Sequence, residues 1–318
     1  KPKTQIKLSI LRKGEAKPLE ITLTREIIKV QSVKSKRVEE DYGYLRVTSF
    51  QENTAASVVK HLTDLYKPGP LKGLVLDLRN DPGGLLNSAI GVSAAFLPPK
   101  TLVTSTDGRT PDAKHLFHAS PEDYLRGTRD DFLKALPAEA RKVPMVVLIN
   151  GGSASASEIV AGALQDHKRA VVMGTTSFGK GSVQTVLPLP NNTAIKLTTA
   201  RYFTPSGRSI QAKGIVPDIV VEESANGVSS FRLREADLEH HLENGKEGKE
   251  GKESKEAPVP VKPQSKAPAT KPKPAAPAKD EDEAAEELPM RELASKKDYQ
   301  LNQALNLLKG LQIMQGNL

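Results

Sequence analysis

The strongest constraint on the fold is a pattern that occurs twice, in which an apolar run is followed by a glycine turn and a helical stretch. The first unit covers residues 73–96, with its turn at 80–84, and the second covers 143–167, with its turn at 151–152. Continuous apolar runs are typical of strands that are buried on both faces. Strands alternating with helices predict an α/β core with a mainly parallel sheet, and functional sites form at the carboxyl ends of such strands.

Residues before this core also follow regular patterns. Apolar and polar residues alternate over 4–10 and again over 19–23, which predicts a two-stranded hairpin. A further strand is expected over 42–50 and a helix over 54–66. A hairpin of this size cannot bury a core alone, so we expect it to pack against the rest or to belong to a larger module.

The C-terminal third changes in composition. Residues 246–256 repeat lysine, glutamate and glycine, and residues 257–278 contain seven prolines, so this region is expected to be a flexible linker. Beyond it, leucines three or four positions apart predict an amphipathic helix over 298–315. On the end of a long linker this helix has no obvious place to bury its apolar stripe within its own chain. We therefore expect it to pack on a second copy or on a partner protein.

Composition and charge exclude several classes of protein. The chain of 318 residues has no apolar run near the roughly 18 to 20 residues of a membrane span, and it has no cysteine for a disulfide, a thiolate metal site or a nucleophile. Residues 1–40 carry six of the eight net positive charges; with no tryptophan and no nucleic-acid motif, we expect a solvated basic surface. The chain opens without an initiator methionine or signal region, so a processed or truncated product is expected.

Three serines stand in the second glycine turn, in the sequence Gly-Gly-Ser-Ala-Ser-Ala-Ser-Glu at residues 151–158. Helix N–H groups exposed at such a turn favour a developing anion. Ser155 and Glu158 also fit a capping box, which is the plainer interpretation. The sequence alone does not rank Ser153, Ser155 and Ser157. A serine nucleophile needs a base, and none of the six histidines lies in a glycine-framed turn.

Lys180 stands between two glycines in residues 177–184, after a short predicted strand at 170–173. A lysine acts as a base only if burial removes its charge. No acidic residue occurs between Asp166 and Asp218 to pair with it in the local sequence, and Gln184 could orient the amine through an uncharged hydrogen bond. A solvent-facing turn lysine is the plainer alternative. Gly83 and Gly84, in the first turn, could direct backbone N–H groups at an oxyanion.

Together and in this order, these segments resemble the carboxy-terminal-processing or tail-specific proteases, which are Ser/Lys peptidases with a PDZ domain beside an α/β core of the crotonase and ClpP type. The matching stretches lie at residues 77–84, 152–158, 178–184, 202–207 and 214–218. They belong to a region of agreement that runs over roughly residues 19–224.

The resemblance implies a role for each matching residue. Ser155 is the nucleophile and Lys180, twenty-five residues later, is the base. Gln184 is the hydrogen-bond partner of that lysine. The oxyanion hole is formed by the N–H of Ala156 with that of Gly83 or Gly84. Ser153 and Ser157 remain capping or packing residues.

The resemblance also divides the chain and shows what it lacks. On this resemblance, the N-terminal strands are expected to be the closing strands of a PDZ domain, without the loop that receives a substrate's carboxyl terminus. The expected parts are a partial PDZ domain at 1–28, the protease core at 29–224, a short helical extension at 225–245, the linker at 246–289 and the amphipathic helix at 290–318.

The function implied is that of a serine endopeptidase that cuts proteins from or near their C-terminal tails and needs no metal or organic cofactor. Its partners would be protein or peptide substrates with exposed tails, a second copy of the chain and an adaptor protein. The resemblance places such enzymes in the bacterial periplasm or, for plant relatives, the thylakoid lumen, and we expect the periplasm. Two alternatives stay open: a crotonase-like enzyme acting on an acyl thioester, and a non-catalytic scaffold that binds peptide tails.

Overall fold

The computed structural model describes residues 1–15, 17–27, 31–127, 130–224, 233–238, 241–242, 293–314 and 316. The chain divides into two compact units, Lys1–Ser32 and Val33–Leu318. The expected linker at 246–289 lies outside the described residues, as does most of the expected helical extension at 225–245. The described part of that extension holds a single 3-10 turn, η5 (Glu235–Asp237).

The first unit is an antiparallel hairpin of β1 (Gln5–Ile10) and β2 (Leu19–Thr24). Its aliphatic side chains are paired across the two strands but stay exposed; they are Ile6, Leu8, Ile21 and Leu23. Whether the hairpin packs against the rest of the chain or belongs to a larger module is therefore not decided within this unit. Its place in a PDZ domain stays a prediction.

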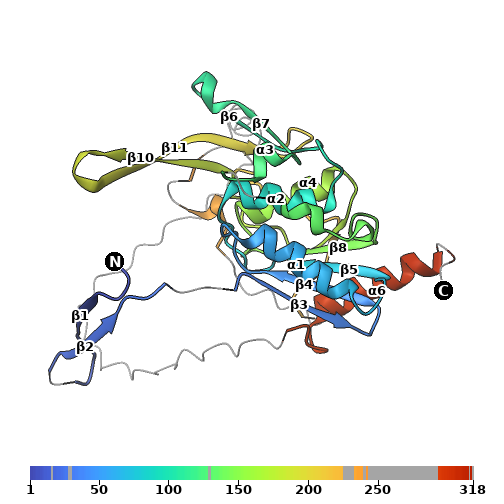
Figure 1. Cartoon of the computed structure of the whole chain (residues 1–318), viewed down its shortest axis with the longest axis horizontal. Helices are drawn as coiled ribbons and strands as arrows, with labels where there is room; N and C mark the ends of the chain where they lie inside the picture. Colours follow the sequence, from blue (N-terminus) through green and yellow to red (C-terminus); the bar gives the residue numbers. More distant parts are fainter. Residues whose placement is uncertain are drawn as a thin grey trace, which may run out of the picture. The chain divides into compact units, whose positions relative to one another are not determined.

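The second unit is built on a six-stranded sheet with the strand order β12-β9-β8-β5-β4-β3 (Figure 1). All neighbouring pairs are parallel except β3 with β4, which confirms the expected α/β core with a mainly parallel sheet. The strands are β3 (Val33–Val38), β4 (Tyr42–Val47), β5 (Gly73–Asp77), β8 (Met145–Ile149), β9 (Val171–Gly174) and β12 (Ile219–Val220). Strands β5 and β8 lie side by side at the centre, so the turns that follow them meet at one sheet edge.

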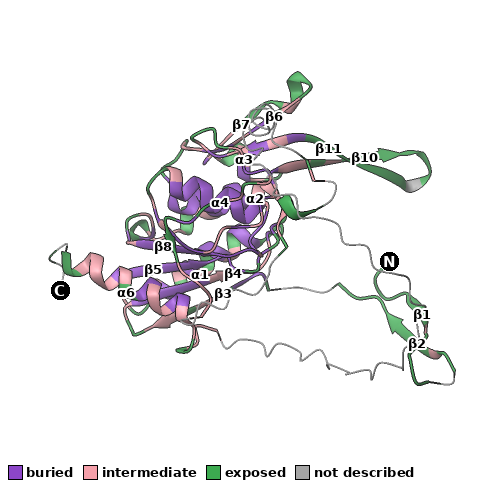
Figure 2. Ribbon diagram, turned by 180° about the vertical axis from the view of Figure 1, so that it is seen from behind, coloured by how far each residue is buried: buried purple, intermediate pink, exposed green. Residues whose placement is uncertain are grey.

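Three helices cover one face of this sheet: α1 (Thr54–Tyr66), α2 (Leu86–Phe96) and α4 (Ala156–Asp166). Side chains along the central strand β8 alternate between the two faces. Val147 and Ile149 join the core under these helices, whereas Val146 and Leu148 join a second cluster on the opposite face. Figure 2 shows that buried residues are concentrated in these strands and helices. The strands are therefore buried on both faces, as their continuous apolar runs indicate.

The opposite face of the sheet is covered by helix α6 (Tyr299–Met314). Its stripe of Leu301, Ala304, Leu305 and Leu308 is buried against β5, β8 and β9 of the same chain. The expectation that this stripe needs a partner protein or a second copy was therefore wrong. The stripe packs on the second face of the sheet. The sequence pattern did not show that the helices of the core leave this face uncovered.

A second sheet has four antiparallel strands in the order β10-β11-β6-β7. They are β6 (Leu102–Gly108), β7 (His115–His118), β10 (Ser182–Leu189) and β11 (Thr193–Phe203). The sequence reading missed this sheet. The remaining short elements of the core are η1 (Pro111–Ala113), α3 (Pro121–Tyr124), η2 (Phe132–Ala135), η3 (Ala138–Arg141) and η4 (Pro190–Asn192).

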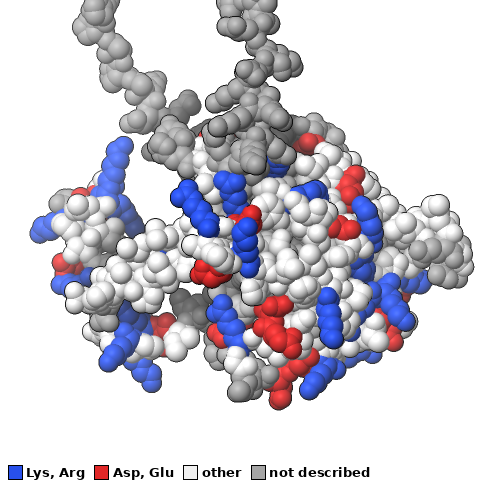
Figure 3. All heavy atoms as spheres, turned by 90° about the horizontal axis from the view of Figure 1, so that it is seen from above, with Lys and Arg blue, Asp and Glu red and all other residues white. Residues whose placement is uncertain are grey.

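Surface charge is mixed over the core. On the face drawn in Figure 3, basic and acidic side chains of the described residues are interspersed. Within the described part of the chain, no helix has both the length and the apolar character needed to cross a bilayer.

We expect Leu305→Ala to lower the free energy of unfolding by about 2–5 kcal/mol, because it empties a fully packed site between α6 and the sheet. Urea denaturation measures this change. Ile313→Ala on the same helix is the control, since Ile313 is 62% exposed. Equal effects of the two substitutions would contradict the packing of α6 described above.

Candidate active site

The turn after β8 ends in a strained serine. Ser155 has φ 55° and ψ −110°, in a region that residues with a Cβ rarely occupy, and helix α4 begins at the next residue. Such backbone strain costs about 1–3 kcal/mol and persists where the surrounding structure enforces it, often at functional sites. A sharp strand-to-helix turn of this kind is also how a nucleophilic serine is presented in α/β hydrolases.

The three serines of this turn differ in what their hydroxyl groups contact. The Ser153 hydroxyl is buried, accepts from the Asn150 N–H and donates to the Leu78 carbonyl at 2.8 Å. The Ser157 hydroxyl is buried and donates to the Asp81 carbonyl at 3.0 Å. Ser155 alone is partly exposed. Ser153 therefore ties this turn to Leu78 after β5, Ser157 ties the start of α4 to the 80–84 turn, and Ser155 is the one of the three that is not buried.

Glu158, in the first turn of α4, connects two segments. One is the serine turn, residues 150–155, and the other is the loop that carries Lys180, residues 175–181, called the lysine loop below. Its side chain is buried, and its two oxygens accept four hydrogen bonds at 2.5–2.9 Å, from the Ser177 hydroxyl and from the N–H groups of Ser155, Gly179 and Lys180. Oε2 accepts from both Ser155 and Lys180, so these two backbone nitrogens lie within about 6 Å of each other. One carboxylate thus sets the spacing of the two candidate catalytic residues.

Burial and hydrogen bonding have opposite effects on the pKa of Glu158. Burial raises its pKa to about 7, although the four hydrogen bonds that its oxygens accept act in the opposite direction. The ionised form can accept all four bonds, whereas a protonated carboxyl must use one oxygen as a donor. The arrangement described here is that of the carboxylate.

Lys180 lies in the loop between β9 and β10, and its side chain is half-buried. Among the described residues, no hydrogen bond joins its amine to the Ser155 hydroxyl or to Gln184. The Gln184 side chain is exposed, on β10, at an irregularity in the pairing with β11. The structure therefore brings the Ser155 and Lys180 backbones together, while the predicted side-chain contacts of Lys180 with Ser155 and Gln184 stay predictions.

The turn at 80–84 lies directly against the serine turn. A Cβ added to Gly83, whose φ is +94°, would lie 2.6 Å from the Ala154 carbonyl oxygen and 2.9 Å from the Ser155 Cβ. Only glycine permits this approach. The Gly83 N–H donates to the Asp81 carboxylate at 2.8 Å. Within the described residues, the N–H groups of Gly84 and Ala156 have no acceptor and stay available.

Asp81 is a buried carboxylate within this turn. One of its oxygens accepts from the Gly83 N–H, and the other, Oδ2, is buried with no partner among the described residues. Burial raises its pKa to about 7. An unsatisfied buried oxygen destabilises the fold by about 1–3 kcal/mol, so Asp81 is held here at a cost in stability.

A buried ionic network lies beneath the same turn, and sequence reasoning assigned its members no role. Arg79 donates three hydrogen bonds to Asp77, two from its guanidinium and one from its backbone N–H, and Arg46 and Tyr44 each add one. Burial alone would raise the pKa of Asp77, but the two arginines and the Tyr44 hydroxyl lower it to about 2. The signal in the sequence was a charged pair, Asp77 and Arg79, at the end of a fully apolar strand.

The described part of the 225–245 segment contacts the lysine loop. The Glu235 N–H donates to the Phe178 carbonyl, and the Glu235 carboxylate accepts from the side chain of Gln211. Gln211 in turn accepts from the Gly181 N–H at 3.0 Å. The loop that carries Lys180 is therefore fixed from two sides, by Glu158 and by this segment.

The candidate site on this α/β core combines a strained serine at a helix start, a lysine loop joined to it by a buried carboxylate, and backbone N–H groups nearby without an acceptor among the described residues. The family model of peptidase family S41 matches residues 41–221, so the chain belongs to this family. The expected resemblance to carboxy-terminal-processing proteases is thereby confirmed.

Two curated relatives and one solved structure show how far the likeness extends. A carboxy-terminal-processing protease of Bartonella bacilliformis is 49% identical over 251 residues, or 77% of this chain and 54% of that protein. A carboxyl-terminal-processing protease of Synechocystis is 38% identical, over 69% of this chain and 48% of that protein. The structure of a photosystem II D1 C-terminal processing protease has a TM-score of 0.50 at 30% identity, covering 70% of this chain and 56% of that one. The chain thus spans about half the length of these relatives.

We expect the contribution of Asp77 to stability to depend on pH. Its pKa is lower in the fold than its ordinary value of 3.8, so it stabilises the fold above that pH, and this contribution is lost as the pH falls towards 2. The difference in free energy of unfolding between wild type and Asp77→Asn should therefore shrink over this range. Urea denaturation at several pH values measures it, with Asp112→Asn, at an exposed carboxylate, as control. A difference that stays constant with pH would contradict the network.

Proposed function

We propose that this chain is the core of a serine endopeptidase in which Ser155 is the nucleophile and Lys180 the general base. The observation that carries the proposal is the shared acceptor: Glu158 holds the N–H groups of both residues on one oxygen, at 2.7 and 2.9 Å. The strained backbone of Ser155 and the engaged hydroxyls of Ser153 and Ser157 support the choice among the three serines.

The proposed reaction uses these two residues in turn. The Ser155 Oγ attacks a peptide carbonyl while the Lys180 amine accepts its proton and passes it to the leaving amine. Water then releases the acyl group from Ser155 with the same amine as base. We infer that the hydrogen bond between Ser155 and Lys180 forms when substrate covers the site, because catalytic hydrogen bonds often tighten only in the complex.

The oxyanion is proposed to be held by the N–H groups of Ala156 and Gly84. Ala156 is the first residue of α4, where helix N–H groups have no partner within the helix. Gly84 is favoured over Gly83, because the Gly83 N–H already donates to Asp81. Gly83 could contribute only after that hydrogen bond breaks.

The proposed substrates are proteins or peptides with exposed C-terminal tails, cut at or near those tails. The names of the relatives from Bartonella bacilliformis and Synechocystis support this substrate class. A periplasmic location is proposed on the same resemblance, and the absence of cysteine is compatible with an oxidising compartment. Association with an adaptor or a second copy stays a prediction, which the apolar stripe of α6 no longer supports.

The direct test is cleavage of an unstructured protein with a free C-terminal tail. We expect Ser155→Ala and Lys180→Ala each to reduce turnover by at least about a thousandfold, as removal of a nucleophile or its base does in other serine peptidases, with unchanged denaturation curves. Lys168→Ala, at an exposed lysine, is the matched control and should keep wild-type turnover. Cleavage by Ser155→Ala at the wild-type rate would refute the assignment.

The two alternative functions give different results in the same experiment. A scaffold would bind the tail peptide without turnover, and an acyl-thioester enzyme would turn over a thioester but not the protein. Labelling of Ser155 by a fluorophosphonate, found by mass spectrometry and absent in Lys180→Ala, would support the peptidase. Membership of peptidase family S41 favours the same result.

Glu158→Gln tests the shared acceptor without touching the reacting groups. A glutamine side chain has one acceptor oxygen, and its NH2 group would face N–H donors that the carboxylate now satisfies. Each buried donor left unpaired costs about 1–3 kcal/mol, so the labelling rate of Ser155 should fall by roughly 10- to 100-fold. Glu122→Gln, at an exposed carboxylate, is the control. An unchanged labelling rate would show that Glu158 does not set the geometry.

A further inference from the structure

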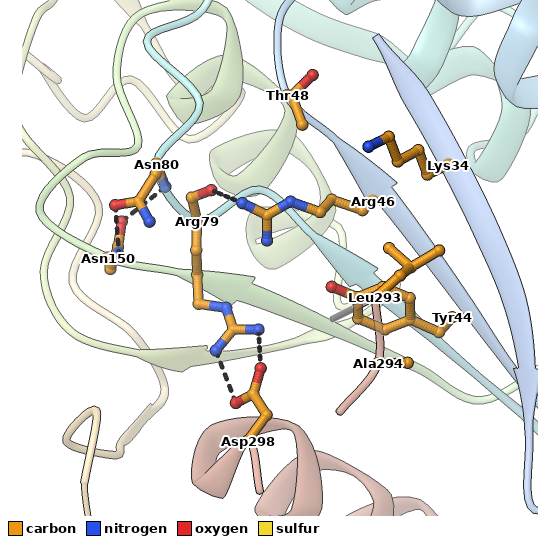
Figure 4. A pocket seen from close by; sticks show the side chains of 10 residues that line it. All are labelled: Lys34, Tyr44, Arg46, Thr48, Arg79, Asn80, Asn150, Leu293, Ala294 and Asp298. Carbon is orange, nitrogen blue, oxygen red and sulfur yellow. Dashed lines mark hydrogen bonds and ion pairs between the residues drawn. The ribbon is translucent and has the colours of Figure 1, made fainter. Parts of the chain in front are cut away.

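The C-terminal helix contributes an ionic contact to the turn beside Ser155. Asp298, one residue before α6, accepts two hydrogen bonds from Arg79, from Nη1 at 2.9 Å and from Nη2 at 2.6 Å. Figure 4 shows this paired contact beneath the strand that leads to Asn80. Gln300, in the first turn of α6, accepts from the same Nη1 at 2.9 Å. Arg79 and Asp298 are separated by 219 positions in the sequence.

Arg79 needs both carboxylates. Its side chain is 5% exposed, and Asp77 and Asp298 each accept two hydrogen bonds from its guanidinium. Asp77 also balances Arg46, which donates to it at 2.9 Å and contacts the Arg79 carbonyl. With Asp298 present, two arginines face two carboxylates. Without it, the buried Arg79 guanidinium keeps Asp77 and the neutral Gln300 but loses one of its two carboxylates, which is costly in a medium of low polarity.

The Arg79 backbone leads directly into the site. The next residue, Asn80, donates its N–H to the Asn150 side chain and accepts from the same side chain, so the turns after β5 and β8 are joined. The carbonyl of Asp81 then accepts from the Ala154 N–H and the Ser157 hydroxyl. These hydrogen bonds connect the Arg79 backbone to both the 80–84 turn and the serine turn.

We propose that Asp298 is a positioning residue that acts through Arg79 to hold the 80–84 turn in place against Ser155. The catalytic part of this inference rests on the proposed function, because the 80–84 turn carries the proposed oxyanion donor Gly84. Helix α6 is on this proposal a component of the active site, because its apolar packing on the sheet places Asp298 against Arg79.

The experiment compares wild type, Asp298→Ala and Lys309→Ala, each as the 318-residue chain. Lys309 lies on the same helix and pairs with Glu39, so its substitution removes an ion pair of α6 that has no contact with Arg79. Two readouts are taken: backbone hydrogen exchange over residues 78–85, which needs no activity, and kcat and KM for the cleaved tail substrate. Sodium formate is then added, because the substitution enlarges a pocket of about 220 Å³ that Arg79 already lines and that a small carboxylate could enter.

We expect Asp298→Ala to speed exchange over residues 78–85 by at least tenfold and to lower kcat by at least tenfold, with KM within twofold of wild type. Formate should restore part of both losses in Asp298→Ala, and Lys309→Ala should match wild type throughout. Formate can replace the missing carboxylate beside Arg79, but it cannot restore the docking of α6 on the sheet. Rescue by formate therefore shows that the losses come from the missing carboxylate and not from a displaced helix.

Unchanged exchange over residues 78–85 in Asp298→Ala would overturn the inference whatever the activity. A loss that formate does not reverse, or that Lys309→Ala reproduces, would also overturn it. If wild type cleaves no substrate, the proposed function fails while the exchange and its formate dependence still decide whether Asp298 holds the turn.

Discussion

The arrangement of the site depends on one buried carboxylate that accepts four hydrogen bonds. Glu158 lies in the first turn of α4, where its oxygens meet the backbone of the serine turn and the backbone of the lysine loop. A buried carboxylate is unfavourable unless its oxygens are satisfied, so the four donors and the acceptor stabilise one another. Neither loop can move away without leaving a charge unsolvated. The strained conformation of Ser155 persists because its own N–H is one of these donors.

The sheet brings the same loops together from below. The turns at 80–84 and 150–154 follow neighbouring parallel strands, β5 and β8, and therefore meet at one edge. Small residues permit the contact, since Gly83 lies against the Ala154 carbonyl and the Ser155 side chain. Buried hydroxyls of Ser153 and Ser157 then join the two turns. The site is thus formed by short contacts between backbones, which explains why glycine and serine dominate it.

Much of the fold followed from periodicity. The strands β5 and β8 and the helices α1, α2 and α4 lie within a few residues of their expected positions, because their apolar patterns are long and unambiguous. The antiparallel sheet of β6, β7, β10 and β11 was missed, because several of its aliphatic side chains are exposed and its strands carry no clear apolar face; examples are Val186, Leu187, Ile195 and Leu197. The docking of α6 was missed because a sequence pattern shows that a stripe exists and not what covers it.

The site was predictable in part. The glycine turns and their polar residues indicated where Ser155 and Lys180 lie, but the sequence offered Glu158 only as a helix cap. Its contacts with the lysine loop join residues about twenty positions apart in sequence, so no local pattern reveals them. The contact between Arg79 and Asp298 was even harder to predict, because the two residues are 219 positions apart and part of the segment between them has a composition unlike that of the core.

The long sequence separation of that ion pair has a consequence for how the molecule matures. A growing polypeptide emerges from the ribosome in order, so the serine turn and the lysine loop are synthesised well before residue 298. Until then Arg79 lacks its second carboxylate and one face of the sheet is bare. On the inference drawn above, the proposed hydrolytic centre is completed only at a late stage of biogenesis, which limits the time in which a half-made chain could attack its neighbours.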